Sequence, residues 1–205
     1  PRILNVGVIG CGGFCKGNHI PNLLANPALR IRALCDLNTA VLAELKESFP
    51  VDYLTTDFQK IFADAQIDMV VCATKPDFRL PIMEAAIKTE KPLFVEKPLC
   101  FTKEDTFRML EMMRGTKIPF MVGFNRPFSP MIQDAKRYFG QYCQNGNKTL
   151  IYRIIGEARI WPKSHYRAII EEGESTLIHE GTHIFNLLNY LTGNYPLSVY
   201  TAGGG

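Results

Sequence analysis

Residues 3–15 read Ile-Leu-Asn-Val-Gly-Val-Ile-Gly-Cys-Gly-Gly-Phe-Cys, an apolar run that ends in a glycine-rich turn. The following residues, 19–24, are typical of a helix, so the sequence predicts a strand, a glycine turn and a helix in succession. Gly10 permits the tight turn and Gly12 lets the backbone approach a pyrophosphate. A helix that begins near Gly13 points its free N–H groups at the phosphates. Cys15 replaces the third glycine of this pattern and is small enough for helix and strand to pack closely. The order of elements predicts a dinucleotide-binding site, although a glycine-rich turn can also be only a turn.

A second strand is predicted over residues 31–36, Ile-Arg-Ala-Leu-Cys-Asp, and it ends in a carboxylate. Dinucleotide-binding folds have an acidic residue about 20 residues after the glycine turn, where it accepts hydrogen bonds from the ribose hydroxyls. A carboxylate at that point repels a 2′-phosphate, so Asp36 favours NAD over NADP. Alternatively, Asp36 is a solvated residue that caps the helix predicted over residues 39–48. The two interpretations are compatible.

The composition agrees with an α/β enzyme and argues against nucleic-acid-binding, disulfide-rich and membrane-spanning proteins. The 205 residues are 46% hydrophobic and 21% charged, with a net charge of +3. Lysines and arginines form no run, so we expect no nucleic-acid partner. The six cysteines include no C-x-x-C pair, which is typical of a reducing compartment. No apolar stretch is long enough to span a bilayer and no signal peptide is recognisable, so we expect no membrane partner and a cytoplasmic location.

Strands and helices continue to alternate as far as residue 124. Strands are predicted over residues 67–74, 92–96 and 119–124, and helices over 81–89 and 103–114. This alternation predicts a doubly wound parallel sheet whose ligands bind beyond the carboxyl ends of the strands. The pattern then changes to a helix near residues 130–139, a loop over 141–148, a strand over 149–159 and a helix near 181–191. We therefore predict a dinucleotide-binding domain over residues 1–124 and a second domain over residues 125–205.

Charged side chains follow two of the predicted strands. Glu96-Lys97-Pro98 ends one strand, and Asn125 and Arg126 end the next. A lysine beside a nicotinamide can hydrogen-bond a substrate hydroxyl and stabilise the alkoxide from which hydride leaves. The alternative is a structural Glu–Lys pair at the edge of the sheet.

These motifs resemble the glucose-fructose oxidoreductase, inositol dehydrogenase and MocA (Gfo/Idh/MocA) family of NAD(P)-dependent dehydrogenases. The resemblance rests on Gly10-x-Gly12-x-x-Cys15, Asp36, Ala73-Thr74-Lys75-Pro76 and, above all, Glu96-Lys97-Pro98. It continues through residues 123–130, Tyr152-Arg153, His165-Tyr166, 171–173 and 178–183. The family implies that residues 1–124 are a Rossmann domain and that residues 125–205 are an incomplete mixed α+β substrate domain, of a kind that often mediates homo-oligomers. It also implies oxidation or reduction of a sugar, an inositol or a related polyol.

The motifs and the resemblance together imply the site residues. Lys97 and His183 are the expected catalytic residues, and no metal is expected. The residues expected to bind NAD are Gly10, Gly12, Gly13, Phe14, Cys15, Asp36, Leu37, Thr74, Lys75, Pro76, Glu96, Lys97 and Asn125. Those expected to bind the substrate are Lys97, Arg126, His165, Tyr166, Glu180 and His183. The chain departs from the family pattern at Arg79, where a histidine is frequent, at Glu174-Ser175, where glycines are frequent, and at Asn186, where an acid is frequent.

Two other functions are compatible with parts of the sequence. His179-Glu180-Gly181-Thr182-His183 matches H-E-x-x-H, the zinc-binding helix of a class of hydrolases. Such a site needs a third protein ligand, and no His, Asp, Glu or Cys follows His183 in this sequence. Gly181 also weakens the helix that the motif requires. The second alternative is a regulatory protein that binds NAD without chemistry, and the presence of both Lys97 and His183 argues against it.

Overall fold

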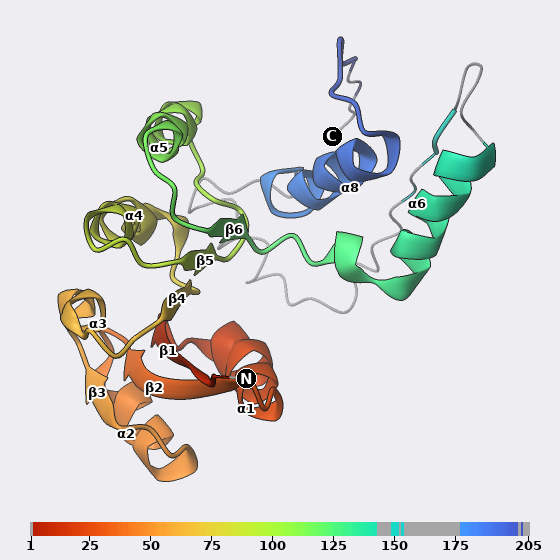
Figure 1. Cartoon of the computed structure of the whole chain (residues 1–205). Helices are drawn as coiled ribbons and strands as arrows, with labels where there is room; N and C mark the ends of the chain where they lie inside the picture. Colours follow the sequence, from red (N-terminus) through yellow and green to blue (C-terminus); the bar gives the residue numbers. More distant parts are fainter. Residues whose placement is uncertain (1, 143–148, 152, 154–176, 201, 203–205) are drawn as a thin grey trace. The chain divides into compact units, whose positions relative to one another are not determined.

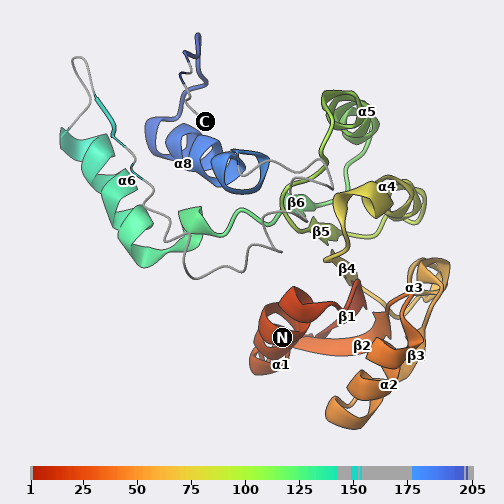
Figure 2. The ribbon, with the colours of Figure 1, turned by 180° about the vertical axis from the view of Figure 1, so that it is seen from behind.

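A computed structural model describes residues 2–142, 149–151, 153, 177–200 and 202. The chain divides into two compact units, Pro1–Gly123 and Phe124–Gly205. Figure 1 and Figure 2 show the elements of each unit from opposite sides.

The first unit contains a parallel sheet with the strand order β3-β2-β1-β4-β5-β6. The chain first winds outward from β1 to β3 and then returns to the other side of β1 to add β4, β5 and β6. The strand order therefore reverses between β1 and β4, which is where doubly wound folds bind ligands. This arrangement confirms the predicted fold class. The strands are β1 (Leu4–Ile9), β2 (Leu29–Cys35), β3 (Tyr53–Thr55), β4 (Met69–Cys72), β5 (Leu93–Val95) and β6 (Phe120–Val122).

Two layers of helices cover the sheet because successive strand residues point to opposite faces. Val6 and Val8 of β1 pack in a core with Ile20 of the first layer. Ile9 packs in a separate core with Ile61 of the second layer, and Figure 1 shows α3, α4 and α5 together on that side. The first layer contains the π-helical turn η1 (Cys15–His19), α1 (Ile20–Ala25) and α2 (Thr39–Ser48). The second contains α3 (Phe58–Ala63), the 3₁₀ turn η2 (Pro76–Phe78), α4 (Arg79–Lys88) and α5 (Lys103–Arg114).

Two helices have the bounds that the sequence predicts, because polar side chains fix where they begin. The Asn38 side chain accepts hydrogen bonds from the N–H groups of Ala40 and Val41 at the start of α2. At the start of α5, Thr102 accepts the N–H of Asp105. Side chains that satisfy the free N–H groups of a first turn are strong helix-start signals. The cap of α2 is Asn38, and not Asp36 as the alternative interpretation proposed.

The structure differs from the sequence-based prediction in short elements. β3 and α3 were not predicted, because a strand of three residues and a helix of six are too short to show a periodic pattern. Seven of the eleven residues of the strand predicted over 149–159 lie outside the described residues. Those described within it, 149–151 and 153, are not in a strand, because a strand requires a hydrogen-bonded neighbour and these residues pair with none in the described chain.

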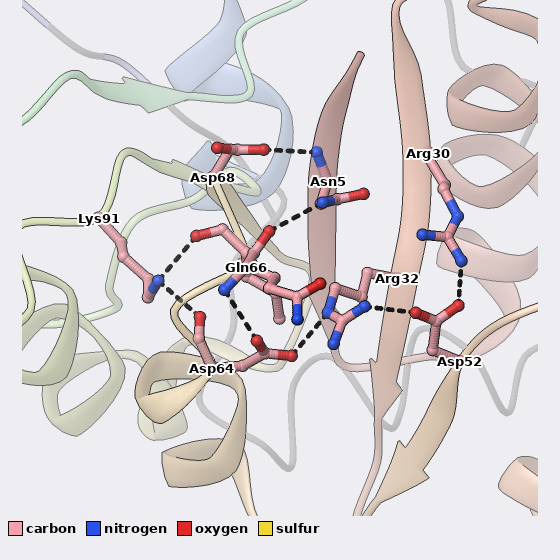
Figure 3. Close-up of polar contacts among 9 residues, drawn as sticks. Asn5, Arg30, Arg32, Asp52, Asp64, Gln66, Asp68 and Lys91 are labelled. Atoms are coloured by element: carbon pink, nitrogen blue, oxygen red, sulfur yellow. Dashed lines mark hydrogen bonds and ion pairs between the residues drawn. The ribbon is translucent and has the colours of Figure 1, made fainter. Parts of the chain in front are cut away.

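Charged residues form a network at the amino ends of the strands, opposite the edge where ligands bind (Figure 3). Arg32 on β2 donates to Asp64 at 2.8 Å and also pairs with Asp52. Burial alone would raise the pKa of Asp64. The N–H of Gln66 and the Arg32 guanidinium outweigh burial and hold this pKa below its ordinary 3.8. This network stabilises the edge of the sheet that does not carry the candidate site.

The elements described in the second unit are all helical. It contains η3 (Arg126–Phe128), α6 (Pro130–Tyr142), the π-helical turn η4 (Leu177–Gly181) and α8 (Thr182–Thr192). Lys136 of α6 donates to the carbonyl of Leu191 at 3.2 Å, so it neutralises the carboxyl end of α8. Gly193 ends α8 in the left-handed conformation, with φ +71°. Within the described residues, no helix is both long and apolar enough to cross a membrane.

Candidate dinucleotide site

A cleft of about 340 Å³ lies at the carboxyl ends of β1, β2 and β4, where the strand order reverses. Predominantly apolar side chains and the glycine turn form its walls. Its lining residues are Ile9, Gly10, Gly12, Cys35, Asp36, Leu37, Thr56, Phe58, Ala73, Thr74, Lys75, Phe78, Pro81 and Ile82. Position and composition fit the binding of a nucleotide with a flat apolar base.

Gly10 and Gly12 lie in this cleft but are constrained differently. Gly10 has φ +86°, and a Cβ atom there would lie 2.7 Å from the backbone nitrogen of Thr74. A side chain at Gly10 is therefore excluded by the close approach of the loop after β4. A Cβ atom at Gly12 would have no neighbour within 4 Å. Gly10 is thus required by the fold, whereas the missing side chain of Gly12 leaves the glycine turn open toward the cleft.

Asp36 is held in a fixed orientation by two backbone groups. Its Oδ2 accepts the N–H of Cys11 at 2.7 Å, and its Oδ1 accepts the N–H of Asn38 at 2.8 Å. Each carboxylate oxygen can accept a further hydrogen bond. Because Asp36 also lines the cleft, it can accept from a ligand without first becoming ordered.

Glu96 connects the glycine turn to the end of β5. Its Oε1 lies 2.9 Å from Nε2 of His19, the last residue of η1, and its Oε2 accepts the N–H of Lys97 at 3.0 Å. His19 contacts the rings of Phe14 and Phe94 edge to face, each at a centroid distance of 5.5 Å. One carboxylate therefore ties the backbone of Lys97 to the helix that follows the glycine turn.

The cysteines near the cleft are buried thiols. Cys11, Cys15, Cys35 and Cys72 are each at most 3% exposed. A hydrogen bond with the Cys15 thiol, and then burial, raises the pKa of Cys11. Burial raises the pKa of Cys35 to about 12. The four buried thiols act as small apolar side chains, and Cys15 packs between helix and sheet as the sequence predicts.

The second unit brings together some of the remaining predicted residues. Arg126 donates to Glu180 at 2.9 Å. His183 is buried at 8% exposure, and its ring lies edge to face with Phe124 at 5.8 Å. His165 and Tyr166 lie outside the described residues, as does the side chain of His179. In the described part of the chain, no three His, Cys, Asp or Glu side chains lie close enough to share a metal.

The predicted NAD-binding residues differ in where they lie relative to the cleft. Gly10, Gly12, Asp36, Leu37, Thr74 and Lys75 line the cleft. Cys15 and Pro76 are buried, and Gly13 and Phe14 are helical residues immediately before η1. Glu96 and Lys97 follow β5, whereas Asn125 belongs to the second unit.

Sequence reasoning missed cleft residues in α3, which was not predicted, and in the turn before α4. Phe58 begins α3, and Phe78 precedes α4 in η2. The side chain of Asp57 accepts the N–H of Gln59, so it caps α3. This Asp was the available signal for a helix that begins at Phe58.

A sequence profile described as an oxidoreductase family with an NAD-binding Rossmann fold matches residues 4–124. The chain belongs to the Gfo/Idh/MocA family. Membership confirms the predicted resemblance, and NAD is the cofactor that the family binds. The family match covers the whole of the sheet and the cleft described above.

Named relatives extend along nearly the whole chain. Inositol 2-dehydrogenase from Rhizobium meliloti is 32% identical over 193 residues, which are 94% of this chain and 56% of that protein. Levoglucosan dehydrogenase from Pseudarthrobacter phenanthrenivorans is 28% identical over 203 residues, 94% of this chain and 52% of that protein. The chain therefore spans about half the length of the relatives that it matches.

The fold is also shared with solved structures. Scyllo-inositol dehydrogenase from Lactobacillus casei, solved with bound NAD(H) and scyllo-inositol, superimposes with a TM-score of 0.78 at 24% identity. The superposition covers 94% of this chain and 57% of that one. It shows that the two chains share a fold.

Proposed function

We propose that this chain forms the cofactor-binding part of a dehydrogenase that transfers a hydride between NAD(H) and a hydroxyl or keto group of a sugar, inositol or related polyol. The observation that carries the proposal is the cleft at the reversal of strand order, with Gly12 open toward it and Asp36 fixed beside it. The two named relatives act, by their names, on an inositol and on levoglucosan. A cytoplasmic location and assembly into homo-oligomers remain predictions.

The cleft residues fit NAD by their chemistry. Free N–H groups after Gly12 suit the pyrophosphate, and the apolar walls at Phe58 and Phe78 suit the adenine. The pre-ordered carboxylate of Asp36 suits the two ribose hydroxyls and disfavours the 2′-phosphate of NADP. NAD, when bound, supplies an acceptor for hydride. Its reactive ring would have to lie toward Glu96 and Lys97 for the reaction to occur at that end of the sheet.

Lys97 is the residue that we assign to stabilising the substrate oxygen as its proton leaves. An ammonium group can donate a hydrogen bond to the substrate oxygen and stabilise negative charge that develops there. His183 is assigned as the acceptor of the hydroxyl proton or as a donor that orients the same hydroxyl, since imidazole can exchange protons near neutral pH. Arg126 and Glu180, together with His165 and Tyr166, are assigned to the other hydroxyls of the substrate.

The experiment is a fluorescence titration of the whole protein with NADH, followed by activity assays with NAD⁺ against a panel of polyols and sugars. The proposal expects saturable NADH binding and turnover of at least one polyol or sugar. Binding without turnover of any compound would favour a regulatory NAD-binding protein. Failure to bind NADH would reject both functions.

A further inference from the structure

Arg79, where the chain departs from the family pattern, is a buried cation at the same edge of the sheet as the candidate site. It is the first residue of α4 and only 3% exposed. Its Nε donates to the carbonyl of Thr74 at 3.1 Å, and its Nη2 donates to the same carbonyl. Its Nη1 donates to the carbonyls of Glu96 and Pro98. One guanidinium therefore binds three carbonyls from the segments that follow β4 and β5.

The three carbonyls belong to the cofactor cleft and to the segment that contains Lys97. Thr74 lines the cofactor cleft. Glu96 and Pro98 are the residues immediately before and after Lys97. Arg79 thus fixes the backbone on both sides of Lys97 and ties it to one wall of the cleft.

Burial of this guanidinium carries a cost that the fold must offset. Loss of hydration lowers the pKa of Arg79, because burial disfavours the charged form. The planar guanidinium can donate in several directions at once, which a methionine or leucine of similar size cannot do. The charged side chain therefore orders the backbone around one lysine.

We propose that Arg79 is a positioning residue for Lys97, whose backbone it ties to the cleft residue Thr74 through the carbonyls of Glu96, Pro98 and Thr74. The proposal rests on the proposed dehydrogenase function, in which Lys97 stabilises the substrate oxygen as its proton leaves. Arg79 itself acts only through the backbone of its neighbours. A displacement of about 1 Å in a reacting group is enough to reduce a rate about a hundredfold.

The chain contains a matched cation that serves as a control. Lys91 is 9% exposed and donates to the carbonyls of Asp64 at 2.9 Å and Ile67 at 2.7 Å (Figure 3). It precedes β5, whereas the Glu96 and Pro98 carbonyls follow the same strand. Lys91 and Arg79 thus make the same kind of contact at opposite edges of the sheet. A purely structural role for Arg79 predicts that their substitutions have similar consequences.

The test compares Arg79→Met, Arg79→Lys and Lys91→Met in the whole protein. The readouts are the Tm, the Kd for NADH, kcat and KM for the best substrate of the panel, and the pH profile of kcat/KM. We expect both methionine variants to lower the Tm. Only Arg79→Met should lower kcat per folded molecule, by about tenfold to a hundredfold, with a smaller change in KM and in the Kd for NADH. It should also displace the pH profile, whereas Lys91→Met should leave kcat and the profile as in the wild type. Arg79→Lys, which keeps a donor and the charge, should recover part of the lost kcat.

The proposal is overturned if Arg79→Met loses stability but keeps the wild-type kcat and pH profile, as Lys91→Met is expected to do. If Arg79→Met does not fold, Arg79→Lys decides: its single nitrogen cannot replace the three nitrogens that Arg79 uses, so its kcat should stay below that of Lys91→Met, and an equal kcat would exclude the positioning role. A wild-type protein that neither binds NADH nor turns over any polyol would reject the proposed function and this proposal with it. Turnover that is insensitive to Arg79 would reject the positioning role alone.

Discussion

Two glycines of the same turn should give opposite phenotypes when each receives a side chain. Gly10 has φ +86°, and an added Cβ atom would lie 2.7 Å from the backbone nitrogen of Thr74 and 2.8 Å from the carbonyl carbon of Ala73. A Cβ atom added at Gly12 would have no neighbour within 4 Å. We therefore predict that Gly10→Ala damages the fold, whereas Gly12→Val damages cofactor binding only.

The expected loss of stability at Gly10 follows from two contributions. A left-handed conformation costs a residue with a Cβ atom about 1–2 kcal/mol. The overlap with two backbone atoms adds to this, because backbone cannot swing aside as a side chain can. We expect Gly10→Ala to lower the free energy of unfolding by about 2–4 kcal/mol in total. In a domain of this size the Tm should then fall by roughly 5–15 °C.

Gly12→Val should leave the Tm within about 2 °C of the wild type, because nothing in the fold meets the new side chain. Its branched side chain would instead lie where the pyrophosphate approaches the turn. We expect the Kd for NADH to rise at least about tenfold, which corresponds to about 1.4 kcal/mol. Fluorescence titration measures the Kd, and thermal unfolding measured by circular dichroism gives the Tm.

Gly17→Val is the matched control. Gly17 lies in η1, also has no neighbour within 4 Å of an added Cβ atom, and is absent from the cleft lining. This variant should bind NADH as the wild type does. Unchanged NADH binding by Gly12→Val, or equal weakening by Gly17→Val, would show that the turn at Gly12 is not the pyrophosphate site.

Three further results are expected. Asp36→Ala should reduce the preference for NADH over NADPH, by on the order of 1–3 kcal/mol, because it removes a fixed carboxylate from the cleft; equal affinities in the wild type would contradict this. Asp64 has a lowered pKa in the folded state, so its contribution to stability is complete above about pH 4 and is lost as the pH falls further. As the pH falls below about 4, the free energy of unfolding, measured by urea denaturation, should therefore decrease less in Asp64→Asn than in the wild type. An equal decrease in both proteins would refute this. The thiols of Cys11, Cys35 and Cys72 have raised pKa values and are buried, so iodoacetamide should label them at least about tenfold more slowly in the folded than in the unfolded protein, as read by peptide mass spectrometry.

Most of the first unit could be predicted from its sequence because its signals are local. The apolar run before Gly10 forms β1, and the polar residues Asn38 and Thr102 fix the starts of α2 and α5. These features depend on neighbours within a few residues, which a sequence displays directly. β3 escaped prediction because a three-residue strand is stabilised by pairing with β2, a contact that arises only in the folded sheet.

The candidate site could be predicted in part for the same reason. Gly10, Gly12 and Asp36 belong to one motif with a known spacing and do line one cleft. The contacts of His19 with Glu96 and of Arg79 with Pro98 join residues 77 and 19 positions apart, respectively. The sequence marked Arg79 only as a departure from the family pattern. Its contacts depend on the pairing of β4 with β5, which brings the ends of the two strands side by side.

Our central proposal is that the protein carries out NAD-dependent oxidation with Lys97 at the reacting hydroxyl. The most direct measurement compares the rate of NADH formation by the wild type and by Lys97→Met, at saturating NAD⁺ and with the best polyol of the panel. We predict that Lys97→Met lowers kcat roughly a hundredfold or more while the Kd for NADH and the Tm stay close to those of the wild type. A variant that keeps its kcat and loses only stability would show that Lys97 is structural and would contradict the account.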